Sequence, residues 1–140
     1  MTMDAGVQNS QYVIGVDFGT DSVRALLLDT GGEQIADAVF HYPRWAKGAY
    51  SDPAHNRFRQ HPLDYLEGLE STVRALLKDL SPRQIKKIRA ISVDTTGSTP
   101  VAVDASGKPL ALKKGFEDNP QCHVYPVEGS YGNTGSGGDQ

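Results

Sequence analysis

The sequence predicts an α/β fold, in which an antiparallel β-meander is followed by one long helix and a further strand. Residues 13–16 and 23–28 are β-branched and aliphatic runs separated by a few turn-forming residues, a pattern typical of a tight hairpin. A turn-rich stretch at 29–33 separates this hairpin from a third extended run at 34–42. Residues 62–80 repeat their leucines at helical spacing instead. We therefore expect the meander to form one edge of a mixed sheet.

The polar centre of the hairpin resembles an anion-binding turn in its residue types. Gly19 can adopt backbone angles that other residues avoid, so we expect main-chain N–H groups there to approach an anion closely. Thr20 and Ser22 add hydroxyl groups, and Arg24 adds a fixed positive charge. The sequence therefore predicts a nucleotide-phosphate turn built on a hairpin.

Asp17 ends the first strand of the hairpin and is the candidate metal ligand. Magnesium prefers one or two carboxylates together with phosphate oxygens and water, so Asp17 is placed to hold a hydrated Mg²⁺. The stretch is neither a Walker motif nor a Rossmann glycine motif. An ordinary hairpin without any ligand is the competing interpretation, because aspartate, glycine and serine are common turn residues.

One apolar stripe identifies the helix predicted at 62–80. Its members are Leu66, Leu69, Val73, Leu76, Leu77 and Leu80. Pro62 suits the first helical turn, and Ser81 is placed to cap a short second helix that reaches Lys87. The stripe is expected to be a core face without chemistry, and residues 88–93 then form a strand of the buried type.

A second polar cluster follows this strand, at Asp94, Thr95, Thr96 and Gly97. Residues at the carboxyl end of a strand in an α/β sheet commonly face the ligand crevice. One carboxylate and two hydroxyls are groups that hydrogen-bond a polyol. A capped turn explains the same residues equally well, and the cluster alone does not choose between the two interpretations.

The segment between the meander and the helix is expected to be a loop. Trp45 and Tyr50 either plug the edge of the core, the favoured interpretation, or line a ligand cleft. The cationic residues after them are spaced unlike metal ligands, so we expect a solvated basic loop. These residues are His55, Arg57, Arg59 and His61.

Composition excludes several classes of function. The 140 residues suffice for one domain with a real core, and the net charge of −3 without a basic run argues against a nucleic-acid partner. No apolar stretch approaches the roughly 20 residues that span a bilayer. The first 11 residues lack the basic and apolar parts of a secretory signal. Cys122 is a single cysteine, so no internal disulfide forms, and a cytoplasmic location is expected.

Several segments together resemble the FGGY family of carbohydrate kinases, and within it the ribulokinases. The hairpin pattern Gly-x-Asp-x-Gly-Thr-x-Ser-x-Arg at 15–24 is shared loosely by the whole family. The segment at 91–104, with its paired threonines, is more specific to ribulokinases. The other matching segments are 42–45 and 58–65.

The resemblance implies a partial ribonuclease-H-like domain of the actin and hexokinase superfamily, with a mixed sheet, a meander and flanking helices. It implies ATP and Mg²⁺ as cofactors and a ketopentose, L-ribulose, as the substrate converted to L-ribulose 5-phosphate in L-arabinose catabolism. By resemblance, Asp17 organises the magnesium and residues 94–97 border the sugar. The residues that surround the transferred phosphate are, by the same resemblance, Gly19, Thr20, Ser22 and Arg24.

The resemblance also divides the chain. Residues 1–11 are expected to be a flexible leader, 12–120 an incomplete N-terminal kinase subdomain, and 121–140 a disordered or frameshifted tail. The family's general base and adenine contacts would lie beyond residue 140, so the chain alone is expected to be inactive. The alternatives are a non-catalytic half-domain that binds sugar or phosphate, and another sugar specificity within the family.

Overall fold

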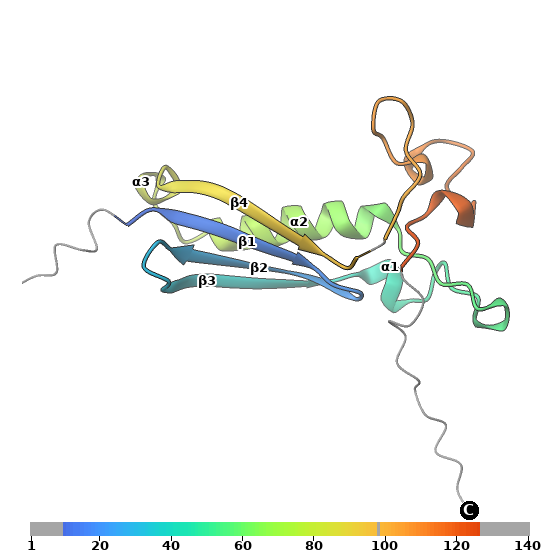
Figure 1. Ribbon diagram of the computed structural model, residues 1–140, viewed down its shortest axis with the longest axis horizontal. Helices are drawn as coiled ribbons and strands as arrows, with labels where there is room; N and C mark the ends of the chain where they lie inside the picture. The colour runs from blue at the N-terminus through green and yellow to red at the C-terminus, as the bar shows by residue number, and fades with distance from the viewer. Residues whose placement is uncertain (1–9, 98, 127–140) are drawn as a thin grey trace, which may run out of the picture.

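The computed structural model describes residues 10–97 and 99–126, and shows a four-stranded mixed sheet with one long helix across one face (Figure 1). The strand order is β3-β2-β1-β4; the first three strands are antiparallel neighbours, and β4 runs parallel to β1. The strands are β1 (Tyr12–Phe18), β2 (Ser22–Asp29), β3 (Gln34–His41) and β4 (Ile88–Thr95). The predicted α/β class, the meander and the mixed sheet are confirmed.

The β1–β2 hairpin buries alternate residues of its apolar runs against the core, such as Ile14 and Val16 on β1 and Ala25 and Leu27 on β2. Tyr12 pairs with Asp29 at the open end and Phe18 with Val23 near the turn. The Asp29 carboxylate also organises the following turn by accepting hydrogen bonds from the N–H groups of Gly31 and Glu33, at 2.8 and 2.9 Å. The sequence therefore sets the register of the meander locally, through alternation and turn chemistry.

The long helix α2 (Pro62–Leu77) covers β2 and β3. Pro62 occupies its first turn as predicted, and the N-terminus is capped by the His61 side chain, which accepts a hydrogen bond from the Leu63 N–H at 3.1 Å. Figure 1 shows this helix running along the back of the sheet. It closes the main core, which contains the fully buried Val23 and Leu27.

The face that α2 buries overlaps the predicted leucine stripe in part: Leu76 is buried, and Leu69 and Leu80 pack against the core. Its most buried members recur every four residues: Asp64, Gly68, Thr72 and Leu76. Leu66, a member of the predicted stripe, is 51% exposed. At Gly68 an added Cβ would lie 2.5 Å from the Val23 side chain and 3.0 Å from that of Phe40. The helix therefore approaches the sheet through a glycine, and this close approach rotates part of the stripe toward solvent.

Short helical turns connect the main elements. They are α1 (Pro43–Ala46), α3 (Pro82–Ile85) and the 3₁₀ turns Pro53–His55, Leu110–Leu112 and Pro120–Cys122. Ser81 caps α3 in a reciprocal capping box with Gln84, as the sequence indicates. The segment predicted as a loop instead begins with α1. Within the described ranges, no helix combines the length and apolar character needed to cross a membrane.

The environment of strand β4 differs from the one that its sequence predicts. It was expected to be buried, yet Ile91 and Val93 are 57% and 59% exposed. The reason is its position at an edge of the sheet, while α2 lies over the far strands β2 and β3. An apolar run therefore identified the strand correctly but not its environment.

Packing continues past the boundary expected at residue 120. Cys122, His123 and Val124 are at most 5% exposed, and Val124 exchanges two backbone hydrogen bonds with Gln60, at 2.9 and 3.1 Å. Part of the segment expected to be disordered is thus packed against the start of α2. The remaining residues of that segment and of the leader, 127–140 and 1–9, lie outside the described residues.

Candidate functional site

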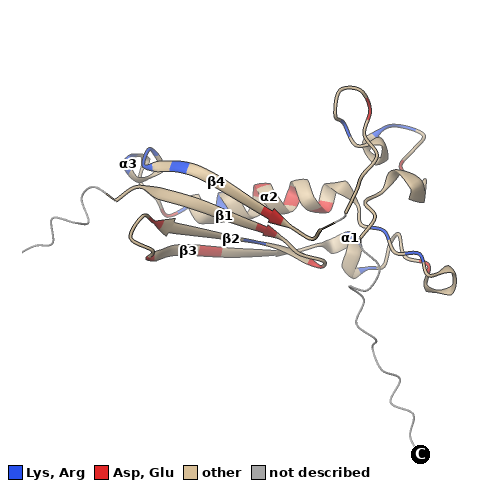
Figure 2. Ribbon diagram, viewed as in Figure 1, with Lys and Arg blue, Asp and Glu red and all other residues tan. Residues whose placement is uncertain are grey.

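Three candidate site residues lie in one row across the sheet. Asp17 on β1 stands opposite Arg24 on β2 and, on its other side, opposite Asp94 on β4. All three are exposed, and because Val16 and Phe18 point into the core, Asp17 points to the face that α2 does not cover. Figure 2 shows acidic positions side by side near the ends of β1 and β4. The fold therefore brings together residues 77 positions apart, as a carboxylate pair beside a guanidinium.

An open hollow of about 590 Å³ lies on the same face. Its lining includes this row and a second polar pair, Asp37 and Ser92, together with apolar side chains such as Leu26. The hollow thus combines three carboxylates, one guanidinium and a hydroxyl. This donor and acceptor set suits a hydrated cation, a phosphate and a polyol better than an apolar ligand.

Asp17 and Asp94 fit a magnesium ion as partial ligands. Magnesium is commonly held by one or two carboxylates, with water and phosphate oxygens completing its octahedron. Among the described residues no group of three or more histidine, cysteine, aspartate or glutamate side chains is arranged to hold a metal by itself. The site therefore fits an ion that arrives with a phosphate, and not a dedicated protein cage.

The hairpin tip uses its polar groups differently from the sequence-based expectation. The Gly19 N–H donates to the Ser22 carbonyl at 2.9 Å, so it is part of the turn. Gly19 does not have a positive φ; an added Cβ would instead lie 3.2 Å from the Ser22 carbonyl oxygen. The Ser22 side chain is 3% exposed and its hydroxyl donates to the Asp21 carboxylate at 2.8 Å. Gly19 and Ser22 thus shape the turn, while Thr20 and Arg24 stay at its surface.

The loop after β4 is tied to the end of β1. The Thr96 N–H donates to the Phe18 carbonyl at 3.2 Å, and the Thr95 N–H donates to the Asp94 carboxylate at 2.8 Å. The hydroxyls of Thr96 and Thr99 bond to each other at 2.9 Å. These contacts are those of a capped turn, and the same turn presents the exposed Asp94 and Gly97 beside Asp17.

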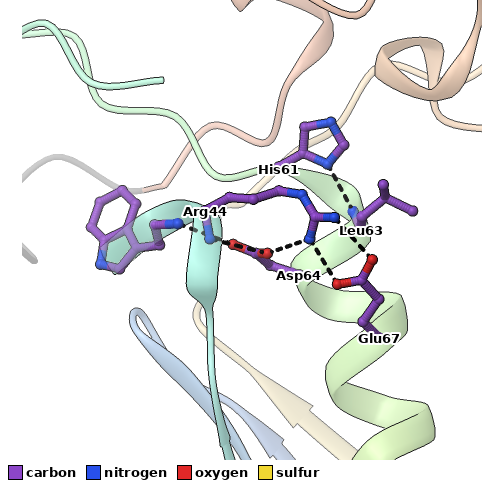
Figure 3. A network of polar contacts seen from close by, with 6 residues as sticks. Arg44, His61, Leu63, Asp64 and Glu67 are labelled. Atoms are coloured by element: carbon purple, nitrogen blue, oxygen red, sulfur yellow. Dashed lines mark hydrogen bonds and ion pairs between the residues drawn. The ribbon is translucent and has the colours of Figure 1, made fainter. Parts of the chain in front are cut away.

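An ion-pair network centred on a buried aspartate anchors α1 to α2 (Figure 3). The Arg44 guanidinium contacts the fully buried Asp64 and the half-exposed Glu67, each at 2.8 Å, and the Trp45 N–H donates to Asp64 at 3.1 Å. The bond to Glu67 raises the pKa of Arg44, and the same bond lowers the pKa of Glu67. No local sequence pattern indicates this role of Asp64, because its partner Arg44 lies 20 residues away.

The predicted basic loop divides into exposed and buried parts. His55 and Arg57 are at the surface, where both contact the Asp52 carboxylate. His61 is 5% exposed, so the solvated interpretation is wrong for it. Its ring packs near Tyr50 and His123, with 5.2 Å between ring centroids in each pair. Burial lowers the pKa of both histidines.

The two aromatic residues of the predicted loop pack inward. Trp45 lies against the main core, and the Tyr50 ring is centred 4.1 Å from that of His123. Neither residue lines the hollow on the open face. The core-plugging interpretation is therefore the better one for both.

Comparison with known protein families shows to which family this domain belongs. A profile of the N-terminal domain of the FGGY family of carbohydrate kinases matches residues 12–122. The chain belongs to the FGGY family of carbohydrate kinases. A ribulokinase of Vibrio parahaemolyticus is 44% identical over 121 residues, which cover 86% of this chain and 21% of that protein. A ribulokinase of Halalkalibacterium halodurans is 38% identical, covering 82% of this chain and 21% of its own length. This chain thus spans about a fifth of the length of these curated relatives.

Solved structures of sugar kinases share the fold. A gluconate kinase from Lactobacillus acidophilus superposes with a TM-score of 0.57 at 19% identity, over 71% of this chain and 18% of its own. A ligand-bound xylulose kinase from the same organism gives 0.56 at 20% identity, over 69% and 18%. These likenesses confirm the actin- and hexokinase-like fold of this FGGY domain.

Proposed function

We propose that this FGGY domain supplies the phosphate- and sugar-facing side of an ATP-dependent kinase that phosphorylates L-ribulose to L-ribulose 5-phosphate, a step of L-arabinose catabolism in the cytoplasm. The observation that carries the proposal is the row of Arg24, Asp17 and Asp94 across the open face. The ribulokinase relatives support the choice of sugar.

Each member of the row has a role in this proposal. Arg24 offsets the negative charge of the transferred phosphoryl group, and the Thr20 hydroxyl donates to one of its oxygens. Asp17 holds magnesium, which when bound neutralises phosphate charge. Asp94 accepts hydrogen bonds from sugar hydroxyls, and the neighbouring Thr95 hydroxyl adds a donor. Phosphoryl transfer depends mainly on positioning and charge neutralisation, which are the properties this row offers.

A chimeric enzyme tests the proposal. Residues 12–122 would replace the matching segment of the Vibrio parahaemolyticus ribulokinase, and ADP release would be measured with L-ribulose and with other sugars. We expect L-ribulose-dependent turnover that Asp17→Asn lowers about 100-fold or more. Asp94→Asn should raise KM for L-ribulose more than it lowers kcat. The matched control is Glu70→Gln, on the exposed side of α2, where the carboxylate contacts Arg74 at 2.8 Å.

The outcomes separate the candidate functions. If the chimera keeps full turnover when it carries Asp17→Asn, the proposed magnesium site at Asp17 is wrong. A preference for another sugar points to a different FGGY specificity. For the 140-residue chain alone we expect no turnover, since the resemblance places the general base and adenine contacts outside it.

A non-catalytic binding role is the second candidate. It is favoured by the fact that the whole row and its hollow lie within residues 12–122, so a ligand can contact them without any other domain. Calorimetric titration of the 140-residue chain with L-ribulose tests this role. Binding that Asp94→Asn removes, in a chain that releases no ADP, would support it; an absence of binding would contradict it.

A further inference from the structure

Gln60 lies outside the row but contacts the hairpin tip. Its side chain is 1% exposed; Nε2 donates to the Thr20 carbonyl at 2.5 Å, and Oε1 accepts from the Tyr65 hydroxyl at 2.8 Å. Because a carbonyl oxygen only accepts hydrogen bonds, the amide orientation is fixed by Thr20. The Gln60 backbone is held as well, through its paired bonds with Val124.

This contact fixes the direction of one peptide group at the tip. In a planar trans peptide the carbonyl and the following N–H point in opposite directions. The Thr20 carbonyl points toward Gln60, so the Asp21 N–H points away from it. Among the described residues no group accepts a hydrogen bond from the Asp21 N–H. The Asp21 carbonyl is held separately, by the Tyr42 N–H at 2.9 Å.

The outward direction is toward the candidate site. Tyr65, on α2, stacks on Phe18 and Tyr42 with centroid distances of 5.4 and 5.2 Å, so Gln60 and its partner lie on the core side of the hairpin. The opposite side is the face with Asp17 and Arg24. An unpaired N–H on the same face as a guanidinium offers two kinds of donor to a tetrahedral oxyanion.

We propose that Gln60, oriented by Tyr65, is a positioning residue that fixes the Thr20–Asp21 peptide so that the Asp21 N–H donates to a phosphoryl oxygen. This role rests on the proposed phosphate site and extends it to a residue that does not touch the ligand. It also explains why a glutamine is fully buried here: both ends of its amide are used.

The test is a titration of the ¹⁵N-labelled 140-residue chain with sulfate at constant ionic strength, followed by amide NMR. Sulfate is the probe because it is a tetrahedral dianion whose charge stays constant at neutral and mildly acidic pH. We expect the Asp21 amide resonance to shift on binding. Gln60→Leu should weaken sulfate binding about tenfold, the effect of misdirecting one charge-assisted hydrogen bond. Tyr65→Phe keeps the stacked ring and should weaken binding about threefold.

A pH profile distinguishes positioning from general destabilisation. Gln60→Glu presents an ionised carboxylate to the Thr20 carbonyl and cannot donate; protonation at acidic pH restores a donor and should restore sulfate binding. Gln84→Ala, which removes the α3 capping box far from the hairpin, is the stability control and should bind as the unaltered chain does.

Two results would overturn the proposal: an Asp21 amide that does not respond to sulfate, or unchanged affinity in both Gln60→Leu and Tyr65→Phe. If Gln60→Leu does not fold, Tyr65→Phe and Gln60→Glu decide the question. Failure of the kinase proposal is distinguishable, because an inactive chimera leaves the sulfate titration of this chain unaffected.

Discussion

The two faces of the sheet are built from the same strands but differ in burial. Beneath α2, Val23, Ala25 and Leu27 are at most 1% exposed and hold the fold together. On the other face, their neighbours Arg24 and Leu26 are exposed beside the hollow. Strand alternation thus places core residues and the residues of the proposed site at neighbouring positions of the same strand. Substitutions on the covered face should change the free energy of unfolding, and those on the open face should change binding.

The largest loss of stability is expected from Asp64→Ala, beneath the start of α2. It removes the buried acceptor shared by the Arg44 guanidinium and the Trp45 N–H, and leaves the arginine with the half-exposed Glu67 alone, so we expect a loss of about 2–4 kcal/mol. Urea unfolding measures this loss. Glu67→Ala removes the exposed partner of the same arginine and should cost less than about 1 kcal/mol. Equal losses in the two variants would contradict the difference between buried and exposed contacts.

A pair of glycines compares the two faces directly. Gly68→Ala places a Cβ 2.5 Å from the Val23 side chain, so we expect a net loss of about 1–3 kcal/mol from overpacking. Gly15→Ala adds the same methyl group on the open face, where nothing lies within 4 Å, and should change stability by less than about 0.5 kcal/mol. Chemical denaturation of both variants is the measurement. A neutral Gly68→Ala would show that α2 can move away from the sheet.

A smaller effect is expected from acid, through His61 and His123. Burial lowers the pKa of both from the ordinary value of 6.5, so the native state resists protons that the unfolded chain accepts. Stability should therefore be full above pH 6.5, begin to fall as the pH drops below it, and stop falling from this cause below the folded-state pKa.

Urea midpoints at about pH 7.5 and about pH 5.5 test this, a range in which carboxylates stay largely ionised. Replacing both buried histidines with asparagine should reduce the difference between the urea midpoints at the two pH values. His41→Asn, at an exposed position without an ion pair among the described residues, should leave it unchanged. A midpoint that rises on acidification would show that the two rings are protonated in the native state.

The smallest effect on stability is expected from Asp17→Asn. The side chain is exposed beside Asp94, so its removal relieves some like-charge repulsion and should change the unfolding free energy by less than about 0.5 kcal/mol. Urea unfolding of this variant beside Asp94→Asn checks it. A large loss in either variant would mean that the open face also supports the fold.

Much of this architecture follows from local sequence alone. Apolar runs separated by turn residues predict the meander, and Pro62 and Ser81 mark the starts of α2 and α3. The family resemblance assigns Asp17 to magnesium and Asp94 to the sugar, and the fold places the two residues opposite each other on neighbouring strands. These features are predictable because periodicity, capping and turn chemistry act over a few residues.

Tertiary structure decided the rest. Only the packing of α2 on β2 shows that Gly68, and not Leu66, faces the sheet, and only the strand order shows that β4 is an exposed edge. The partners of Asp64 and Gln60 lie 20 and 40 residues away, so no local pattern contains them. The sequence determined which elements form, because backbone propensities are local. Their environments and the direction of the hairpin N–H depend on contacts between distant segments, which exist only once the chain has folded.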